Sequence, residues 1–341
     1  MDIKDFDYFL PEHLIAQTPL EKRDNSRLLV MNKKDGSITH KHFFDIVDYL
    51  HRGDVLVLNN SKVIPARIFG KRSGSGGLVE TLLLKSVGKD EWEVLVKPGR
   101  KAMVGQVIEY GDLMTGVVTA IKEDGKRTIR FEYNGNNIYE ILDKIGNMPL
   151  PPYIKEKLED KDRYQTVYAK DLGSSAAPTA GLHFTDKLLE TLKNKGVIVK
   201  FVTLHVGLGT FRPVKVNDIT QHIMHSEHYC VPEDTAREIG LAKKEGRRII
   251  CVGTTSVRTV ESAFDVNGNV IRESGDTSIF IYPGYKFKIP DAIITNFHLP
   301  QSTLVMLVSA FSTREYILKA YDEAIKNEYR FFSFGDAMLI E

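Results

Sequence analysis

The feature that most constrains the fold is a long stretch, residues 63–146, in which short predicted strands follow one another without a helix. Val, Leu, Ile and Thr are concentrated in five segments, and Gly-containing turns separate them. Strands at this spacing, with no helix between them, are typical of a small antiparallel barrel. The five expected strands are Leu78–Lys85, Glu91–Val96, Val107–Tyr110, Gly116–Ile121 and Thr128–Tyr133.

Both flanks of this stretch alternate predicted strands with predicted helices. Expected strands are Asp54–Leu58, Val197–His205, Arg248–Val252, Ser278–Ile281 and Ala292–Thr295. Expected helices are Asp186–Lys195, capped by Thr185, and Glu233–Gly246, Thr255–Phe264, Ser302–Phe311 and Glu315–Glu328. Such alternation predicts an α/β fold: a mostly parallel sheet with helices on both faces, in three layers. We expect a discontinuous α/β domain of residues 1–62 and 150–341, with residues 63–149 inserted as the barrel domain.

Composition restricts the class of protein. The 341 residues are 42% hydrophobic and 27% charged, as in an ordinary globular chain with an ample core. No run approaches ~18 apolar residues, so we expect no membrane span. The acidic N-terminus does not resemble a secretion signal, and the two cysteines, Cys230 and Cys251, are too few for a disulfide scaffold. These features predict a cytoplasmic protein in which both cysteines are small residues of the core.

Charge is balanced overall but not locally. The net charge is +1, whereas residues 60–101 carry nine Lys or Arg and four Asp or Glu. Such an excess predicts a surface for a polyanion, and the alternative is an ordinary solvated barrel surface. The candidate contacts are Lys62, Arg67, Lys97, Arg100 and Lys101.

Three histidines follow small or apolar segments that end at predicted strand or helix boundaries. His183 ends the segment Gly173–His183, just before a predicted helix, and His205 and His298 follow predicted strands. Ligands of an open parallel sheet collect at the carboxyl ends of its strands, so all three histidines are expected on one rim. An imidazole there can transfer protons near neutral pH. The alternative for each is a buried histidine bonded to the backbone.

The segment Gly253–Arg258 predicts an anion cradle. A glycine turn, the hydroxyls of Thr254, Thr255 and Ser256, and the start of a helix follow a predicted strand, with Arg258 as a forked partner. Phosphate or carboxylate would fit such a turn, and the alternative is a plain capped helix. The segment lacks the lysine and the spacing of a P-loop, and no Gly-x-Gly-x-x-Gly motif is present.

Two other patterns argue against common chemistries. His222, His225 and His228 are evenly spaced, but the segment looks irregular and has no zinc-site spacing, so we expect no metal. Glu227, beside them, is a candidate to tune one histidine or to reach a substrate. No Gly-x-Ser-x-Gly elbow is present, which argues against an α/β serine hydrolase.

Taken together, these segments resemble a known family along almost the whole chain. The matching segments are Asp5–Tyr8, Leu14–Gln17, Ser26–Leu29, Asn59–Arg67, Lys97–Lys101, Met148–Tyr153, Tyr164–Tyr168, Gly173–Phe184, His205–Pro213, Val252–Thr259, Thr295–Thr303 and Phe334–Met338. The chain resembles the S-adenosylmethionine:tRNA ribosyltransferase-isomerases of queuosine biosynthesis. It departs visibly at Ser61, where threonine is more usual, and the hydroxyl is kept.

The resemblance implies a reaction. The family transfers and isomerises the ribosyl part of S-adenosylmethionine onto 7-aminomethyl-7-deazaguanine at the tRNA wobble position, giving epoxyqueuosine in tRNA, methionine and adenine. S-Adenosylmethionine is then a consumed cosubstrate, and no cofactor is permanently bound. The partners are that tRNA and S-adenosylmethionine, with no membrane, and we expect a monomer.

A physical hypothesis for this implied reaction gives roles to particular residues. A base would remove a proton from C5′ next to the sulfonium, and an acid would assist the leaving adenine; His183, His205 and His298 are the candidates, in no fixed order. Phe184, Phe211 and Phe297 would stack on adenine or on the modified base. Thr179 and Asn296 join Gly253, Thr254, Thr255, Ser256 and Arg258 as candidate substrate-binding residues. The basic stretch would hold the anticodon arm through its phosphates.

Two alternative functions are also compatible with parts of the sequence. An ordinary S-adenosylmethionine-dependent methyltransferase would release S-adenosylhomocysteine, but the chain lacks the early Gly-rich turn of such enzymes. A non-catalytic RNA-binding module built on the barrel would leave the three histidine segments unexplained.

Overall fold

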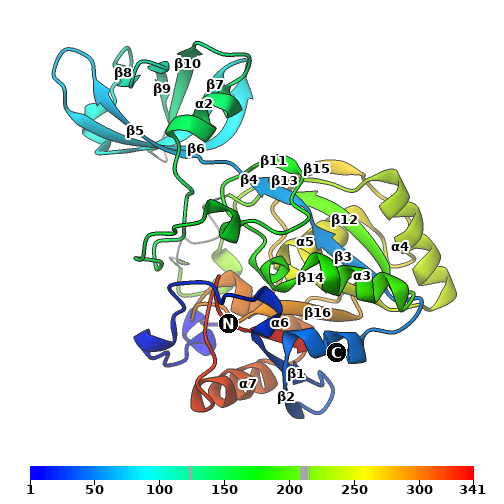
Figure 1. Ribbon diagram of the computed structural model, residues 1–341. Coiled ribbons are helices and arrows are strands. Elements are labelled where there is room, and N and C mark those ends of the chain that lie inside the picture. The colour runs from blue at the N-terminus through cyan, green and yellow to red at the C-terminus, as the bar shows by residue number, and fades with distance from the viewer. Residues whose placement is uncertain (123–124, 208–213, 215) are drawn as a thin grey trace. The chain divides into compact units, whose positions relative to one another are not determined.

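The computed structural model describes residues 1–122, 125–207, 214 and 216–341, and it divides into two compact units (Figure 1). The first unit contains Met1–Ser61, Pro152–Asp171 and Pro178–Glu341. The second contains Lys62–Pro151 and Leu172–Ala177. No helix in the described part of the chain is long and apolar enough to cross a membrane.

A nine-stranded sheet forms the centre of the first unit. In spatial order its strands are β15 (Ser274–Thr277), β13 (Glu227–Cys230), β12 (Ile198–Leu204), β3 (Val55–Asn59), β14 (Ile249–Val252), β16 (Ala292–Asn296), β17 (Ala337–Ile340), β1 (Arg27–Met31) and β2 (Ile38–His42). A separate two-stranded sheet joins β4 (Ser61–Val63) and β11 (Asp171–Ser174).

The prediction of a mostly parallel sheet is not confirmed, because the sheet is mixed. Strands β12, β3, β14 and β16 are parallel neighbours. On one side β13 is antiparallel to β12, and β15 is antiparallel to β13. On the other side β17 is antiparallel to β16. Strand β17 is antiparallel to β16 although two helices, Thr303–Phe311 and Arg314–Lys326, lie between them in the chain. The alternation of strands and helices therefore does not by itself determine strand direction. The predicted strand at 278–281 is wrong, since β15 lies just before it.

Helices of the first unit begin close to their predicted positions. They are α3 (Asp186–Asn194), α4 (Glu233–Glu245), α5 (Gly253–Ala263), α6 (Thr303–Phe311) and α7 (Arg314–Lys326). The short helix α1 (Ile46–Tyr49) was not predicted. The Thr185 hydroxyl accepts the Leu188 N–H at 3.1 Å, which confirms the predicted cap of α3. Helix α5 starts at Gly253, two residues earlier than expected.

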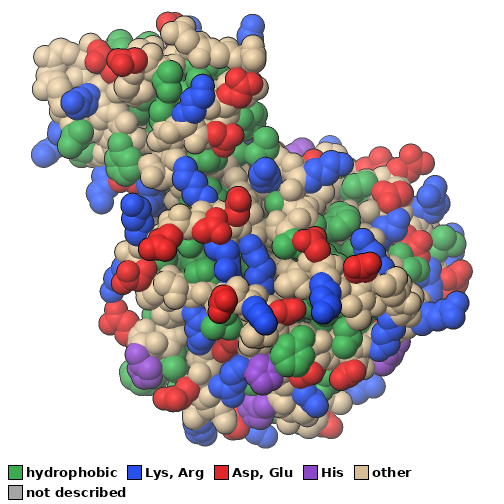
Figure 2. All heavy atoms as spheres, viewed as in Figure 1, with side chains coloured by type: hydrophobic (Ala, Val, Ile, Leu, Met, Phe, Trp, Pro, Cys, Tyr) green, Lys and Arg blue, Asp and Glu red, His purple; other side chains and the backbone are tan. Residues whose placement is uncertain are grey.

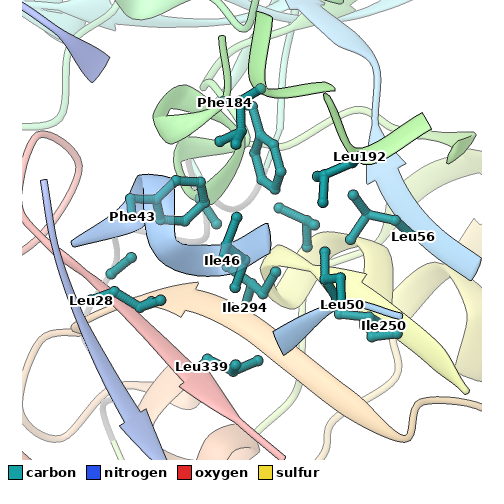
Figure 3. Packing of buried hydrophobic residues seen from close by; sticks show 14 of the residues in the cluster. Leu28, Phe43, Ile46, Leu50, Leu56, Phe184, Leu192, Ile250, Ile294 and Leu339 are labelled. Atoms are coloured by element: carbon teal, nitrogen blue, oxygen red, sulfur yellow. The ribbon is translucent and has the colours of Figure 1, made fainter. Parts of the chain in front are cut away.

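One face of the sheet is covered by a continuous apolar cluster (Figure 3). Leu56, Ile250 and Ile294 project from the parallel strands toward Phe43 and Phe184. Side chains of α3 and α1 complete this cluster. Helices α4 and α5 contact the same strands but contribute no side chain to it, so they cover the opposite face. The sheet is therefore sandwiched between helices, as the sequence predicts.

The second unit confirms the expected antiparallel barrel. Its closed order is β10 (Arg127–Tyr133), β7 (Glu91–Lys97), β6 (Leu78–Gly88), β5 (Arg67–Arg72), β8 (Val107–Tyr110) and β9 (Met114–Ile121). Trp92, Tyr110 and Phe131 are buried inside, and α2 (Ile138–Ile145) packs against the same cluster. Strand β5 was not expected from the sequence, although closure of the barrel requires it.

A buried asparagine fixes the end of the central strands. Asn59 Oδ1 accepts the N–H groups of Ser61 and Leu204 at 3.0 and 3.1 Å, and its Nδ2 donates to the Leu204 carbonyl at 3.0 Å. The amide therefore takes the place of a strand backbone, and it holds β12 against β3 where His205 leaves the sheet.

Replacing Asn59 with Ala removes these three bonds from a buried position. We expect Asn59→Ala to lower the free energy of unfolding by about 2–4 kcal/mol, because buried main-chain groups lose partners. Urea denaturation followed by circular dichroism measures this loss. The exposed Asn269 provides the control, and Asn269→Ala is expected to change stability by less than about 1 kcal/mol. An equally small effect of Asn59→Ala would contradict this role.

Candidate active site

The predicted site residues of the first unit gather at one edge of the sheet. Strands β12, β3, β14 and β16 are parallel, so their carboxyl ends share that edge. His205 follows β12, Gly253 follows β14, and Asn296 ends β16. Gly253 has a positive φ of 81°, and a Cβ at this position would lie 3.6 Å from the Ala180 Cβ. The glycine turn and the segment of His183 are therefore neighbours.

His183 sits in a hydrogen-bonded chain that spans three segments of the sequence. It ends the 3-10 turn Thr179–His183 and is 4% exposed. Its Nδ1 lies 2.6 Å from Ser26 Oγ, and its Nε2 lies 3.1 Å from Asn296 Nδ2. The Phe43 ring stacks on the imidazole, with centroids 4.9 Å apart. The ring is thus fixed on both edges and on one face.

The partners of Asn296 determine the protonation of the imidazole. Asn296 Nδ2 lies 3.1 Å from the Phe332 carbonyl and 3.4 Å from the Asp336 carbonyl, which orients the amide nitrogen as donor. It therefore donates to His183 Nε2, and the imidazole proton resides on Nδ1. Nδ1–H donates to Ser26 Oγ, whose own proton is directed to the Arg23 carbonyl at 3.2 Å. The donors of this hydrogen-bonded series therefore all point the same way, from Asn296 through His183 and Ser26 to the Arg23 carbonyl.

A cleft opens beside His183 within the first unit. It encloses about 310 Å³, including the part open to solvent, and its walls come from residues within 19–26, from Arg163, and from the segments 182–183 and 333–335. Polar groups in the lining belong to Arg23, Ser26, Arg163, His183 and Ser333. None of the lining residues is an acid. His183 and Ser26 are therefore accessible to a ligand although each is almost fully buried.

Burial and positive charge keep His183 neutral. Desolvation, and then the charges of Arg23 and Arg330, lower the pKa of His183 to about 3. At neutral pH the ring is therefore uncharged, with a lone pair on Nε2. Such a ring can accept a proton from a substrate only when the substrate also supplies compensating negative charge or hydrogen bonds.

His298 faces the protein interior rather than the cleft. Its ring Nε2 lies 2.8 Å from Thr295 Oγ1. Its backbone N–H donates to Tyr321 Oη at 3.0 Å, and its backbone carbonyl accepts the Tyr8 hydroxyl. Burial lowers the pKa of His298 to about 3. These contacts on both ring and backbone suit a residue that fixes the end of β16.

A second polar cluster lies beyond β12. Glu227 pairs with Arg258, lies 3.1 Å from His225 Nε2 and accepts the Gly207 N–H at 2.8 Å. Burial alone would raise the pKa of Glu227, but Arg258, His225 and this N–H lower it to about 2. His205 is half-buried nearby in the fold, and burial, then His228, lowers its pKa. The Nδ1 atom of His205 is buried, and none of the described residues forms a hydrogen bond with it.

The glycine turn is only partly engaged by the protein. The Ser256 hydroxyl donates to the Val252 carbonyl, so it is occupied within the helix. Thr254 is 7% exposed. In contrast, Thr255 Oγ1 and the Nε and Nη2 atoms of Arg258 are buried without a hydrogen-bond partner in the described part of the chain. The predicted cradle therefore keeps unsatisfied polar groups after Arg258 has paired with Glu227.

The aromatic candidates are placed differently. Phe184 and Phe297 are fully buried: Phe184 lies edge-on to Phe43, and Phe297 lies among Tyr321, Tyr329 and Phe331. Neither has ring surface exposed for a ligand in this structure. Thr179, at the start of its 3-10 turn, is half-buried. Phe211 lies outside the described residues.

The basic candidates all belong to the barrel unit. Lys62, Lys97 and Arg100 are exposed, Lys101 is half-buried, and Arg67 lies 3.3 Å from Glu80. On the face shown in Figure 2, positive and negative side chains alternate without a large patch of one sign. Among the described residues, no group of three or more His, Cys, Asp or Glu is arranged to hold a metal.

Comparisons with known proteins identify the family of this chain. Residues 3–340 match the family model described as queuosine biosynthesis protein. A Clostridium kluyveri protein named S-adenosylmethionine:tRNA ribosyltransferase-isomerase is 59% identical over 342 residues, covering 100% of both chains. The chain belongs to this family. It is thus a transferase and isomerase that uses S-adenosylmethionine to modify tRNA in queuosine biosynthesis.

A solved structure agrees with this assignment. The crystal structure of an S-adenosylmethionine tRNA ribosyltransferase from Thermotoga maritima is 39% identical and has a TM-score of 0.56. The match covers 99% of this chain and 100% of that one.

Several residues at the candidate site of this ribosyltransferase-isomerase were not expected from the sequence. Ser26 lies within a family-like segment, but only the structure places it on His183. Arg23, Arg163 and Arg330 come from remote segments that had no recognised pattern. Their partners are mainly backbone carbonyls, which leave no trace in a sequence.

The depressed pKa values of the two buried histidines predict acid sensitivity. Each is lowered from 6.5 to about 3, so unfolding takes up a proton at each site below about pH 6.5. The stability that comes from keeping these two imidazoles neutral is fully present above pH 6.5 and is lost as the pH falls toward 3. Each histidine should therefore lower the free energy of unfolding by about 1.4 kcal/mol for every unit that the pH falls between about pH 6 and 3.5.

Urea denaturation over this pH range tests the assignment. His183→Gln and His298→Gln should each remove about one proton from the pH slope. The exposed His13 gives the control, since His13→Gln should leave the slope unchanged. The same slope in all four proteins would show that neither histidine is held neutral.

Proposed function

We propose that this enzyme transfers and isomerises the ribosyl part of S-adenosylmethionine onto the aminomethyl group of 7-aminomethyl-7-deazaguanine at the tRNA wobble position. The products are epoxyqueuosine in tRNA, methionine and adenine, and S-adenosylmethionine is consumed rather than permanently bound. Family membership supports the class of reaction. The observation that carries the site is the chain Ser26–His183–Asn296 at the wall of a cleft.

His183 is the best-placed candidate for the base. The sulfonium acidifies the neighbouring C5′–H bonds, and the Nε2 lone pair of a neutral imidazole is a suitable acceptor. Asn296 occupies this lone pair at rest, so the substrate has to displace or share that contact. Ser26 fixes the tautomer through Nδ1, in the manner of the orienting group of a catalytic triad. Ser26 and Asn296 are thus positioning residues.

The acid for the leaving adenine is then sought elsewhere. His205 is half-buried at the same edge of the sheet, and its Nδ1 has no partner. We assign it the role of proton donor to adenine. His298, whose ring and backbone are held by Thr295 and Tyr321, is a positioning residue in this proposal.

We place the methionine carboxylate of S-adenosylmethionine at the glycine turn. Helix α5 begins there, and Thr255 Oγ1 with Arg258 Nε and Nη2 offers unpartnered polar atoms. A carboxylate would satisfy these donors and gain from the positive end of the helix. In the barrel, Lys62, Arg67, Lys97, Arg100 and Lys101 remain the proposed contacts to the phosphates of the anticodon arm, and such contacts weaken with salt.

Product analysis tests the proposed function. Incubation with S-adenosylmethionine and tRNA carrying the modified base should release adenine and methionine in equal amounts. His183→Gln should reduce the rate by at least about 100-fold, the usual contribution of a general base, whereas His13→Gln should not alter it. S-adenosylhomocysteine as the product would reveal a methyltransferase, and tRNA binding without turnover would reveal an RNA-binding module.

Thr255→Val tests the carboxylate site separately. Valine has a similar shape but removes a buried hydroxyl that has no protein partner, so stability should be unchanged or slightly higher. If this hydroxyl binds the carboxylate, KM for S-adenosylmethionine should rise about tenfold, with KM for tRNA unchanged. Thr259→Val, one helical turn later, is the control, because its hydroxyl donates to the Thr255 carbonyl. An unchanged KM would exclude Thr255 from binding.

A further inference from the structure

Three arginines near His183 are held by the main chain rather than by acids. Arg23 donates to the carbonyls of Asp162, Gln165 and Leu182. Arg163 donates to the carbonyls of Leu20 and Glu21, and Arg330 donates to that of Thr18. Within the described part of the chain, none of the three guanidinium groups has a carboxylate within salt-bridge distance.

Nearby acids do not neutralise this group of charges. Asp160 and Asp162 act on Arg23 only from a distance, and both are exposed. Asp336 lies near Arg330, but its oxygens accept the backbone N–H groups of Arg27 and Arg330. Burial is the main reason that the pKa values of Arg23 and Arg330 are lowered. A cluster of cations that are half-buried and lack acid partners is costly to hold.

Donors in this cluster also remain unused. Arg163 Nε and Arg330 Nη1 are buried and have no hydrogen-bond partner among the residues that the structure describes. Arg23 and Arg163 line the cleft directly, and Arg330 holds Thr18, beside the lining residue Pro19. Uncompensated positive charge and unsatisfied N–H groups, beside a cleft without acids, are what an oxyanion site requires.

The charges of the two substrates decide which oxyanion fits. S-Adenosylmethionine carries a sulfonium and an ammonium against one carboxylate, so the molecule as a whole is a cation and three arginines repel it. RNA brings one negative charge per phosphate. We propose that this cleft binds a phosphate of the tRNA next to the modified nucleotide, through Arg23, Arg163 and Arg330. This inference rests on the proposed function, since it names the part of the tRNA that reaches His183.

Such an arrangement also suits the chemistry at the modified base. The nucleophile is an aliphatic amine, which attacks only when it is neutral. Guanidinium charges close by disfavour its ammonium form, as they disfavour the imidazolium form of His183. A bound phosphate would partly offset the positive charge of the arginines around His183, which would raise the pKa of His183 and make it a stronger base. The tRNA would therefore complete the electrostatics of its own site.

Binding without turnover tests the proposal. Fluorescence anisotropy with an unmodified tRNA transcript, in the absence of S-adenosylmethionine and over a series of salt concentrations, gives Kd and its salt slope. Arg163→Gln and Arg330→Gln should each raise Kd about 5- to 20-fold, and each should reduce the slope by about 0.7–0.9. Arg330→Gln removes a single hydrogen bond to the protein, so this variant is expected to fold. Its Kd for tRNA therefore tests the proposal even if Arg163→Gln fails to fold.

Arg247 supplies the matched control. It precedes β14 at the amino edge of the sheet, and it pairs with Glu238 and Glu245. Arg247→Gln removes the same charge and should change Kd for tRNA less than twofold. Calorimetric Kd values for S-adenosylmethionine should stay within twofold of the unsubstituted protein in Arg163→Gln and Arg330→Gln.

Two results would overturn the phosphate assignment. One is an unchanged tRNA Kd and salt slope in both arginine variants, and the other is a selective loss of affinity for S-adenosylmethionine, which would place a carboxylate in the cleft. The proposed function fails on a different observation, namely no adenine release by the unsubstituted protein. Arginine-dependent tRNA binding by an inactive protein would therefore leave the phosphate site in place.

Discussion

The site depends on the parallel pairing of β12, β3, β14 and β16. This pairing brings residues about 50 to 100 positions apart in the sequence to one edge, and it does so with backbone hydrogen bonds. Asn59 strengthens the edge by acting as additional backbone between β3 and β12. The antiparallel outer strands extend the sheet without disturbing this arrangement. Without the shared edge, Asn296 at the end of β16 would not lie within hydrogen-bond distance of His183.

The same edge explains why a nearly buried histidine is available for chemistry. Packing against Phe43 fixes the imidazole, and Asn296 and Ser26 fix its tautomer. Burial, and then the charges of Arg23 and Arg330, lower the pKa of His183 and keep its ring uncharged at rest. In the proposed mechanism His183 is therefore a weak base until an anionic group, the tRNA phosphate, binds beside it. That property links the proposed phosphate site to the proposed base.

Some of this could be predicted from the sequence, and some could not. Helices with clear caps, such as α3 after Thr185 and α6 after Ser302, were predicted within one or two residues, because capping is a local property. The barrel was predicted from segments rich in Val, Leu, Ile and Thr and from the turns between them, although one of its strands was missed. Strand β17 was not predicted, and its pairing with β16 depends on residues distant in the sequence. Asn296 was an expected site residue, but its partnership with His183 spans 113 positions.

The arginines illustrate the limit most clearly. Arg23, Arg163 and Arg330 act through carbonyls of the main chain, and any residue supplies a carbonyl. Conversely, Phe297 and His298 looked like ligand contacts, and the structure shows one in the aromatic core and the other turned toward Thr295. Residue type and spacing revealed the edge on which chemistry is possible. Burial and the partner of each polar atom distinguish binding from packing.

The central claim is that a base at this edge removes a proton from C5′ of S-adenosylmethionine. The most direct measurement uses S-adenosylmethionine with both C5′ hydrogens replaced by deuterium, followed by mass spectrometry of the modified nucleoside from the tRNA. The account predicts that the transferred ribosyl group retains one of the two deuterium atoms. Retention of both would contradict proton removal at C5′, and with it the role assigned to His183.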